Sequence, residues 1–392
     1  MSLPDRLKEE LEQLKSKGMY REIPKIDGYN RTINGMINLS SNDYLGLLNN
    51  SKIREAFIQN YFNNTALKFS SASSRLLTGN CTLYNKLEDK LASLFNKEAA
   101  LIFNSGYHAN SGILPALTQS GNNLILADKL VHASIIDGIK LSGCKFFRYQ
   151  HNNYTHLRGL VEKNYKEFDT IFIVTEALFS MDGDFADIQE LVKIKEEFKN
   201  IVLYIDEAHS FGSIGEAGLG LCYSLNLEKE IDIIVGTFGK AISSVGAFAV
   251  TNREIREYLI NKMRPLIFST ALPEINIAWS YYIIEQLPKL NNEREHLKTI
   301  GALLREAIST ITGLAPISNS FIVPFITGSA DSALELSNTL KNNGFYGLAV
   351  RPPTVPPNSS RIRFSLTALV TIEEIKQLIS ILNNRICSNE KL

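Results

Sequence analysis

The middle of the chain alternates short apolar runs with helical segments, and no other sequence feature constrains the fold as strongly. Apolar runs that predict buried strands cover residues 99–103, 123–127, 170–175, 201–205, 231–235 and 247–250. Helical spacing of apolar residues predicts helices at 83–95, before these runs, and at 188–200, among them. This alternation is typical of α/β proteins with a mostly parallel sheet. Ligands in such sheets bind at the carboxyl ends of the strands, where this sequence places polar residues.

The last third of the chain predicts a smaller α+β part. Helices are expected at residues 294–311, 332–342 and 372–382, with strands at 321–326, 346–350 and 360–365. We therefore expect an N-terminal helix and strand segment at residues 1–48, a large domain at 49–280 and a C-terminal α+β domain at 281–392. Residues 69–80 are expected to form a loop, and residues 266–273 an extended connection.

Composition excludes several classes of function. The 392 residues carry a formal net charge of +0, so nucleic acid is not indicated as a partner. The apolar runs are too short to predict membrane spans, and the charged, helical start predicts no signal peptide. The four cysteines fit neither a zinc spacing nor a disulfide framework. We therefore expect a cytoplasmic protein without a metal centre.

The stretch Val235-Gly236-Thr237-Phe238-Gly239-Lys240 leads from an apolar run through small residues to a lysine. A lysine amine can hold an aldehyde cofactor as a Schiff base, with the Thr237 hydroxyl on the cofactor phosphate. A surface lysine after a strand is the simpler interpretation of this stretch by itself. The choice between the two depends on the rest of the chain.

A second polar group follows the strand expected at 201–205. A carboxylate such as Asp206 is costly to bury unless it is paired, and a protonated pyridine nitrogen is a suitable partner. The pair would keep the ring cationic, so that it could accept electrons from a carbanion. His209, three residues later, could bond a ring oxygen. A capping aspartate with a core histidine explains these two residues equally well.

A third group combines strand, glycine turn and helix start. Ser105, Gly106 and Tyr107 join the strand at 99–103 to a helix, where free N–H groups and the helix dipole suit a phosphate. His132, at the start of another helical segment, could stack on a flat cofactor, although a structural histidine is more common. The pattern favours an anion site but is weak by itself.

The C-terminal part contributes candidate substrate residues. Residues 351–357 are too rich in proline for a central strand, and this rigid connection could hold Arg351 and Thr354 toward a site. Arg361 and Arg363 alternate, so that they share one face, and one fixed guanidinium is a natural clamp for a substrate carboxylate. A solvated edge strand is the alternative for one of this pair.

Together these segments resemble the α-oxoamine synthases, a family of fold-type I pyridoxal-phosphate enzymes. The resemblance runs from about Arg21 to Leu382, and its motifs stand in family order. It implies an α/β fold like that of aspartate aminotransferase, with a mostly parallel central sheet and a smaller C-terminal α+β domain. The motifs are residues 38–46, Ser105-Gly106-Tyr107, 128–132, Ser180-Met181-Asp182-Gly183-Asp184, Asp206-Glu207-Ala208-His209 and Thr237-Phe238-Gly239-Lys240.

The resemblance implies pyridoxal 5′-phosphate as the cofactor and assigns roles by position. Lys240 would hold the aldehyde and then act as the base, Asp206 would pair with the pyridine nitrogen, and His132 would stack on the ring. His209 and Ser180 would bind the ring oxygen. Gly106, Tyr107 and Thr237 would bind the phosphate. Ser269 or Thr270 would reach the phosphate of the partner subunit's cofactor. The implied catalytic set is Lys240, His132, Asp206 and His209, and the implied substrate-binding set is Arg21, Asn42, His132, Thr354 and Arg363.

The family joins an amino acid to an acyl thioester with loss of carbon dioxide. Residues 351–356 favour its biotin-pathway branch, which implies L-alanine and a pimeloyl thioester on coenzyme A or acyl carrier protein, in a homodimer with active sites at the interface. Open alternatives are a relative that uses glycine or serine, a catalytically inactive binding protein and a phosphate-binding protein without pyridoxal. The sequence departs from the family pattern at residues 70–74, at Tyr84, and at residues 242–244, where small glycines usually follow the lysine.

Overall fold

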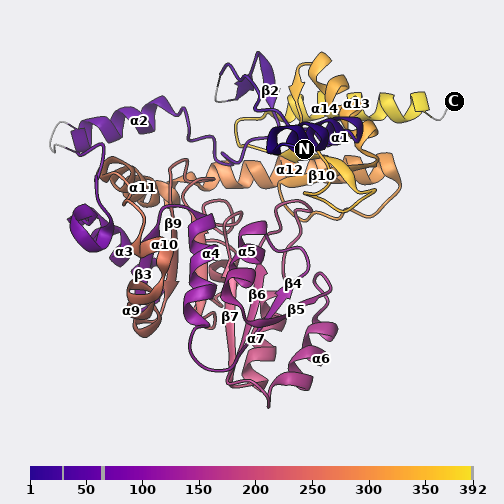
Figure 1. Cartoon of the computed structure of the whole chain (residues 1–392). Helices are drawn as coiled ribbons and strands as arrows, with labels where there is room; N and C mark the ends of the chain where they lie inside the picture. Colours follow the sequence, from indigo (N-terminus) through magenta and orange to yellow (C-terminus); the bar gives the residue numbers. More distant parts are fainter. Residues whose placement is uncertain (29–30, 63–66, 390–392) are drawn as a thin grey trace. The chain divides into compact units, whose positions relative to one another are not determined.

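The computed structural model describes residues 1–28, 31–62 and 67–389 and divides the chain into two compact units (Figure 1). The smaller unit comprises residues 1–49, 181–184 and 295–392, and the larger one comprises residues 50–180 and 185–294. The large unit thus continues past residue 280 through helix α11 to Arg294. The three-part domain division expected from the sequence stays a prediction.

A seven-stranded sheet organises the large unit, with strand order β3-β9-β8-β7-β6-β4-β5. The five strands β4 to β8 all run parallel to one another. Strand β9 is antiparallel to both of its neighbours, β3 and β8. The predicted mostly parallel sheet is therefore confirmed. The strands are β3 (Ala99–Phe103), β4 (Asn123–Asp128), β5 (Lys145–Tyr149), β6 (Thr170–Glu176), β7 (Ile201–Asp206), β8 (Ile233–Thr237) and β9 (Ala247–Thr251).

The helices of the large unit are α2 (Ser51–Phe57), α3 (Thr82–Leu94), α4 (Gly106–Leu117), α5 (Ala133–Ser142), α6 (Tyr154–Asn164), α7 (Ile188–Glu197), α8 (Leu221–Ser224), α9 (Arg253–Lys262), α10 (Arg264–Ile267) and α11 (Glu274–Gln286). Helices α4 to α8 connect successive strands from β3 to β8 in the α/β manner. Short π-helical turns, Ile58–Phe62 and Arg75–Gly79, and the 3-10 turn Leu287–Leu290 complete the set. Among the described residues, no helix has both the length and the apolar character needed to cross a membrane.

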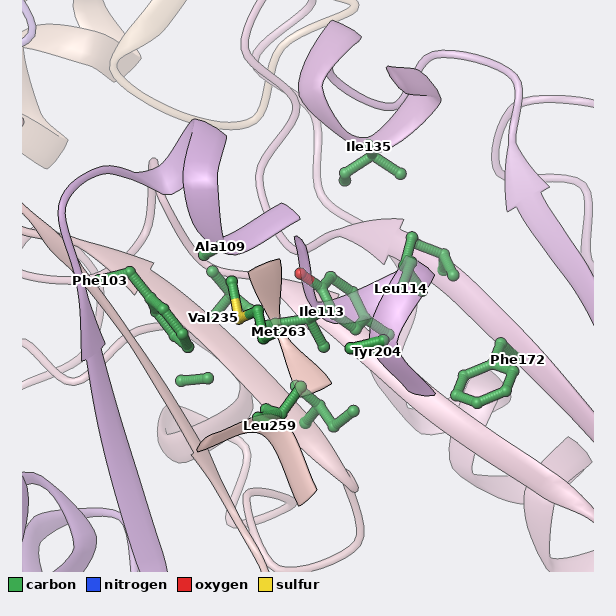
Figure 2. Close-up of a cluster of buried hydrophobic side chains, with 14 of the residues drawn as sticks. Phe103, Ala109, Ile113, Leu114, Ile135, Phe172, Tyr204, Val235, Leu259 and Met263 are labelled. Atoms are coloured by element: carbon green, nitrogen blue, oxygen red, sulfur yellow. The ribbon is translucent and has the colours of Figure 1, made fainter. Parts of the chain in front are cut away.

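An apolar cluster holds helices α4, α5 and α9 against the sheet (Figure 2). Ile113 and Leu114 of α4 lie over Tyr204 and Val235, the side chains of two adjacent strands. These residues are at most 1% exposed, so the cluster removes a large apolar area from water. Its position under the start of α4 gives that helix terminus a rigid base.

Helices α4 and α5 approach unusually closely. A Cβ atom on Gly138 of α5 would lie 2.3 Å from the backbone oxygen of Asn110 in α4. Only glycine permits this contact, because neither backbone can move aside without displacing its helix. The close approach fixes where Asn110 sits above the sheet.

Several elements differ from those predicted. Residues 266 and 267, expected at the start of the extended connection, instead end helix α10 (Arg264–Ile267), in which Pro265 occupies a first-turn position that tolerates a missing N–H. The strand expected at 346–350 is two short strands in different sheets, and the expected loop at 69–80 contains a π-helical turn. Strand β5 was not predicted. It is an exposed strand at the edge of the sheet, and its sequence mixes charged and aromatic residues instead of forming a long apolar run.

The small unit contains two three-stranded sheets, with orders β1-β2-β11 and β10-β13-β12. Its predicted strand at residues 360–365 is confirmed as β13, which lies in the middle of its sheet. The alternative of a solvated edge strand for Arg361 or Arg363 is therefore wrong. The elements are α1 (Leu3–Ser16), β1 (Thr32–Ile33), β2 (Met36–Asn38), β10 (Ile322–Gly328), α13 (Ala330–Asn342), β11 (Phe345–Tyr346), β12 (Ala349–Val350), β13 (Ser360–Ser365) and α14 (Ile372–Asn389), with most of α12 (Asn291–Thr312).

Candidate active site

A cavity of about 170 Å³ lies at the edge of the large sheet where its parallel strands end. Strands β6, β7 and β8 each end in a residue that lines it, as expected for an open α/β sheet. The cavity thus gathers side chains from segments that are far apart in the sequence. The lining residues are Gly106, Tyr107, Asn110, His132, Ser134, Glu176, Asp206, Ala208, His209, Thr237 and Lys240.

Lys240 lies in the turn that follows β8. Its Nζ is 2.8 Å from Nε2 of His209, so the amine and the imidazole can exchange a proton directly. Thr237, the last residue of β8, donates its hydroxyl proton to the carbonyl of Gly246 at 3.0 Å and accepts from the N–H of Gly239 at 3.2 Å. These bonds fix the backbone on both sides of the lysine.

Asp206 is only 4% exposed, yet its carboxylate faces the cavity. Oδ2 accepts a hydrogen bond from Nδ2 of Asn110 at 2.7 Å, and Oδ1 accepts one from the N–H of Ala208 at 2.8 Å. The hydroxyl of Tyr204 in turn donates to Oδ1 of Asn110 at 2.6 Å. Such support keeps a carboxylate oriented while leaving it available to a cationic partner in the cavity.

His132 precedes helix α5 and is tied to the same network. Its Nδ1 accepts from the backbone N–H of Ser134 at 3.2 Å and lies 2.8 Å from the Ser134 hydroxyl, which accepts from Asn110. Desolvation lowers the pKa of His132, and the nearby charge of Asp206 opposes this shift only in part. The ring is therefore neutral at neutral pH, which suits stacking on a flat cationic partner.

Glu176 at the end of β6 pairs in register with Asp206 of β7. Burial is the main cause that raises the pKa of Glu176 to about 8, and the charge of Asp206 is the next. Within the part of the chain that the structure describes, its Oε1 is a buried atom without a hydrogen-bond partner. The raised pKa keeps a second negative charge away from this edge of the sheet at neutral pH.

The phosphate corner predicted from the sequence lies at the start of α4. Gly106 is the first residue of the helix, and the Ser105 side chain caps it by accepting from the N–H of His108 at 3.1 Å. The first N–H groups of a helix have no intrahelical acceptor and carry the positive end of the dipole. Thr237 lies beside them, since a Cβ on Gly106 would be 3.9 Å from its Oγ1.

The donor set fits pyridoxal phosphate. An aldehyde needs an amine, a pyridinium needs a carboxylate, a flat ring needs a stacking partner, and a phosphate needs N–H donors. Lys240, Asp206, His132 and the start of α4 provide these groups around one cavity. Of the predicted cofactor residues, Ser180, Ser269 and Thr270 are not among those that line it.

Of the predicted substrate residues, His132 lines the cavity of the large unit, and the other four lie in the small unit, where they form two pairs. The guanidinium of Arg21 donates to the hydroxyl of Thr354 at 2.8 Å. Arg363 donates to Oδ1 of Asn42 at 3.3 and 3.4 Å. Arg361, on the same face of β13 as Arg363, is 4% exposed and forms an ion pair with Asp182. Arg363 is therefore the more available of the two arginines.

Sequence reasoning missed four residues that line or support the cavity, namely Asn110, Ser134, Glu176 and Tyr204. Two of them had a signal. Tyr204 precedes Asp206 by two residues on the same face of a strand, and Asn110 follows Gly106 by one helical turn. Ser134 and Glu176 had no comparable signal, because a serine near a helix start and a glutamate at a strand end are common.

Comparisons with known proteins agree with this geometry. The sequence profile of the family Aminotransferase class I and II matches residues 34–382. A relative from Haemophilus influenzae (strain 86-028NP), which carries 8-amino-7-oxononanoate synthase as its provisional name, is 52% identical over 382 residues, which cover 96% of this chain and 100% of the relative.

Two solved structures extend the likeness. A serine palmitoyltransferase variant from S. paucimobilis, with a bound compound of PLP and myriocin, is similar with a TM-score of 0.87 and 26% identity over 100% of both chains. An 8-amino-7-oxononanoate synthase from Francisella tularensis has a TM-score of 0.75 and 29% identity, covering 91% of this chain and 99% of that one. The cofactor of the chain is pyridoxal 5′-phosphate. The chain therefore belongs to the aminotransferase class I and II family and, within it, to the pyridoxal-phosphate-dependent acyltransferases that its 8-amino-7-oxononanoate synthase relatives represent.

Proposed function

We propose that the enzyme condenses L-alanine with a pimeloyl thioester and releases carbon dioxide, the free thiol carrier and 8-amino-7-oxononanoate, in biotin biosynthesis. The observation that carries the proposal is the cavity itself. It brings a lysine amine, a buried aspartate and a neutral histidine together around one space. The names of relatives that are 52% identical support the choice of substrates.

The residues of the chain would hold the cofactor as follows. Lys240 would hold the aldehyde, Asp206 the pyridine nitrogen and His209 the ring oxygen. The N–H groups of Gly106 and Tyr107, with the hydroxyl of Thr237, would hold the phosphate. When bound, pyridoxal phosphate supplies an electron sink for the negative charge left at the alanine Cα.

The proton chemistry falls to Lys240. Its amine, once released from the aldehyde, removes the proton from the alanine Cα as a general base. His209, 2.8 Å away, can take up or return that proton. The alanine Cα forms a carbon–carbon bond to the thioester carbonyl, the carbon–sulfur bond breaks, and the thiol leaves. The carboxylate then departs as carbon dioxide, and Lys240 returns a proton to the carbon that held it.

Arg363 would bind the carboxylate of the amino acid, with Asn42 orienting its guanidinium. Arg21 and Thr354 would contact substrate as a hydrogen-bonded pair. Replacing Arg363 with alanine should raise the KM for alanine at least tenfold, the scale of one charge-assisted bond, with a smaller change in kcat. An unchanged KM for alanine would show that Arg363 does not bind the substrate carboxylate.

The test of the reaction is a product assay with L-alanine and with pimeloyl thioesters of coenzyme A and acyl carrier protein. The parent protein should form 8-amino-7-oxononanoate, and Lys240→Ala should form none while keeping its fold by circular dichroism. If product formed from glycine or serine but not from alanine, the proposed substrate would be wrong and the enzyme would have the activity of another member of the family. A parent protein without the visible absorbance of lysine-bound cofactor would indicate an inactive binding protein.

The proposed assembly is a homodimer in which each subunit completes the other's site. Ser269 or Thr270 would reach the phosphate of the partner's cofactor, and Phe268, next to them, is 72% exposed in the single chain. Mixing Lys240→Ala subunits with Ser269→Ala/Thr270→Ala subunits should restore activity, because one of the two sites in each mixed dimer is then intact. Mixtures no more active than the separate variants would contradict shared sites.

A further inference from the structure

The turn that follows Lys240 is held in an unfavourable conformation. Ser243 has a φ of 50°, in the left-handed region that a side chain with a Cβ atom disfavours. Its N–H donates to the carbonyl of Lys240 at 2.8 Å, which closes the turn directly on the lysine. Because this conformation is unfavourable for a residue with a Cβ atom, contacts from outside the turn are needed to keep it in place.

Helix α11 supplies two contacts to this turn. The indole N–H of Trp279 donates to the carbonyl of Ser243 at 3.0 Å. The next residue, Ser280, is fully buried, and its hydroxyl lies 2.8 Å from the hydroxyl of Ser244. Consecutive residues of one helix therefore bind consecutive residues of the turn, which restrains both its position and its rotation.

Trp279 itself is anchored by aromatic packing. Its ring meets the ring of Phe57 edge to face, with centroids 5.0 Å apart, and lies 6.2 Å from the ring of Tyr282. Phe57 is 4% exposed and also packs on Tyr282 at 5.7 Å. Because these rings fill one cluster, the indole N–H has little freedom to leave the Ser243 carbonyl.

The backbone on the other side of Lys240 is also fixed. The N–H of Ser244 donates to the carbonyl of Phe238 at 2.8 Å, and the N–H of Phe238 donates to the carbonyl of Gly246 at 2.9 Å. Lys240 thus lies in a loop, residues 238–246, that is closed by backbone hydrogen bonds, and Trp279 binds this loop at the Ser243 carbonyl. A shift of the loop at Ser243 would move the Lys240 amine relative to His209.

We propose that Trp279 is a positioning residue for Lys240, whose indole N–H, with the Ser280 hydroxyl, fixes the turn that carries the lysine. The proposal rests on the role of Lys240 proposed above. Trp279 and Ser280 are not among the residues that line the cavity, so their effect would pass through the backbone of residues 240–244.

The test compares Trp279→Phe, which keeps an aromatic ring but loses the N–H, with Tyr282→Phe, which alters the same ring cluster and leaves the bond to Ser243 in place. Hydrogen exchange of the cofactor-free protein should accelerate about fivefold or more in residues 237–246 of Trp279→Phe only. In the loaded protein, the pH midpoint of the visible cofactor band should shift, and kcat should fall about tenfold with KM nearly unchanged. Tyr282→Phe should stay within twofold of the parent.

Equal exchange in the two variants, or a loss of melting temperature without a shift of the band, would overturn the proposal and leave Trp279 a packing residue. If Trp279→Phe does not fold, Ser280→Ala carries the test, and unchanged exchange in that variant overturns it. Exchange and the cofactor band do not depend on which substrates are used. A parent protein that binds cofactor but makes no 8-amino-7-oxononanoate would refute the proposed reaction and leave this inference standing.

Discussion

Asn110 links the buried carboxylate of the active site to the core beneath it, and replacing it with alanine is the most informative perturbation. Its amide nitrogen donates to Asp206 at 2.7 Å and to Ser134 at 3.0 Å, and its oxygen accepts from Tyr204 at 2.6 Å. Asn110 is 2% exposed and Tyr204 is fully buried, so water cannot replace these partners readily. Asn110→Ala therefore breaks three buried hydrogen bonds at once.

The magnitude follows from those bonds. A hydrogen bond to a charged group contributes about 2 kcal/mol and a neutral one about 1 kcal/mol, and a buried hydroxyl left without a partner costs about 1–3 kcal/mol. Asn110→Ala should therefore lower the free energy of unfolding by about 4 kcal/mol. Tyr204→Phe, which removes only one hydroxyl, should lower it by about 1–2 kcal/mol. The double variant should lose less than the sum, because the two residues share one bond.

Urea unfolding of the cofactor-free protein, followed by circular dichroism, measures these free energies. The affinity for pyridoxal phosphate should also fall in Asn110→Ala, since Asp206 loses the donor that orients it. Asn164→Ala is the matched control: Asn164 is 3% exposed and donates to the carbonyl of Leu160 at 2.7 Å, away from the cavity. Additive losses in the double variant, or an unchanged cofactor affinity in Asn110→Ala, would refute the reasoning.

Three further predictions follow from single contacts. Gly138→Ala should destabilise the protein by about 2–4 kcal/mol, because the new Cβ would lie 2.3 Å from the Asn110 carbonyl oxygen. It should also weaken cofactor binding. A melting temperature within about 2 °C of the parent would contradict this prediction. Because the pKa of Glu176 is raised from 4.5 to about 8, the folded state retains its proton longer than the unfolded state, so the stability of the cofactor-free protein should fall as pH rises through this window. Glu176→Gln should flatten that dependence in urea titrations at successive pH values. Arg361→Ala should lower stability by about 3–5 kcal/mol, because it leaves Asp182 without its ion-pair partner, and a loss below about 1 kcal/mol in urea unfolding would show that the pair is solvated.

Local pattern predicted much of the large unit. Residues 171–174 and 201–205 are runs rich in apolar side chains, and a buried parallel strand needs that pattern, so the strands and their order along the chain could be predicted. Edge strand β5 could not, because an exposed strand mixes charged and aromatic residues without a long apolar run. The split of residues 345–350 between two sheets depends on partners elsewhere in the chain, which no local pattern contains.

The site divides in the same way. By itself the sequence determined the chemistry that is available: a lysine after a strand, an aspartate at a strand end, and a glycine turn before a helix, each placed by the rule that strand ends share one edge of the sheet. Tertiary structure alone decided that the Asn110 amide reaches Asp206, that burial raises the pKa of Glu176 beside it, and that the Trp279 indole N–H binds the Ser243 carbonyl. The physical reason is that hydrogen bonds and pKa values depend on distance and burial in three dimensions, and the two partners of each of these interactions are separated by tens of positions along the chain.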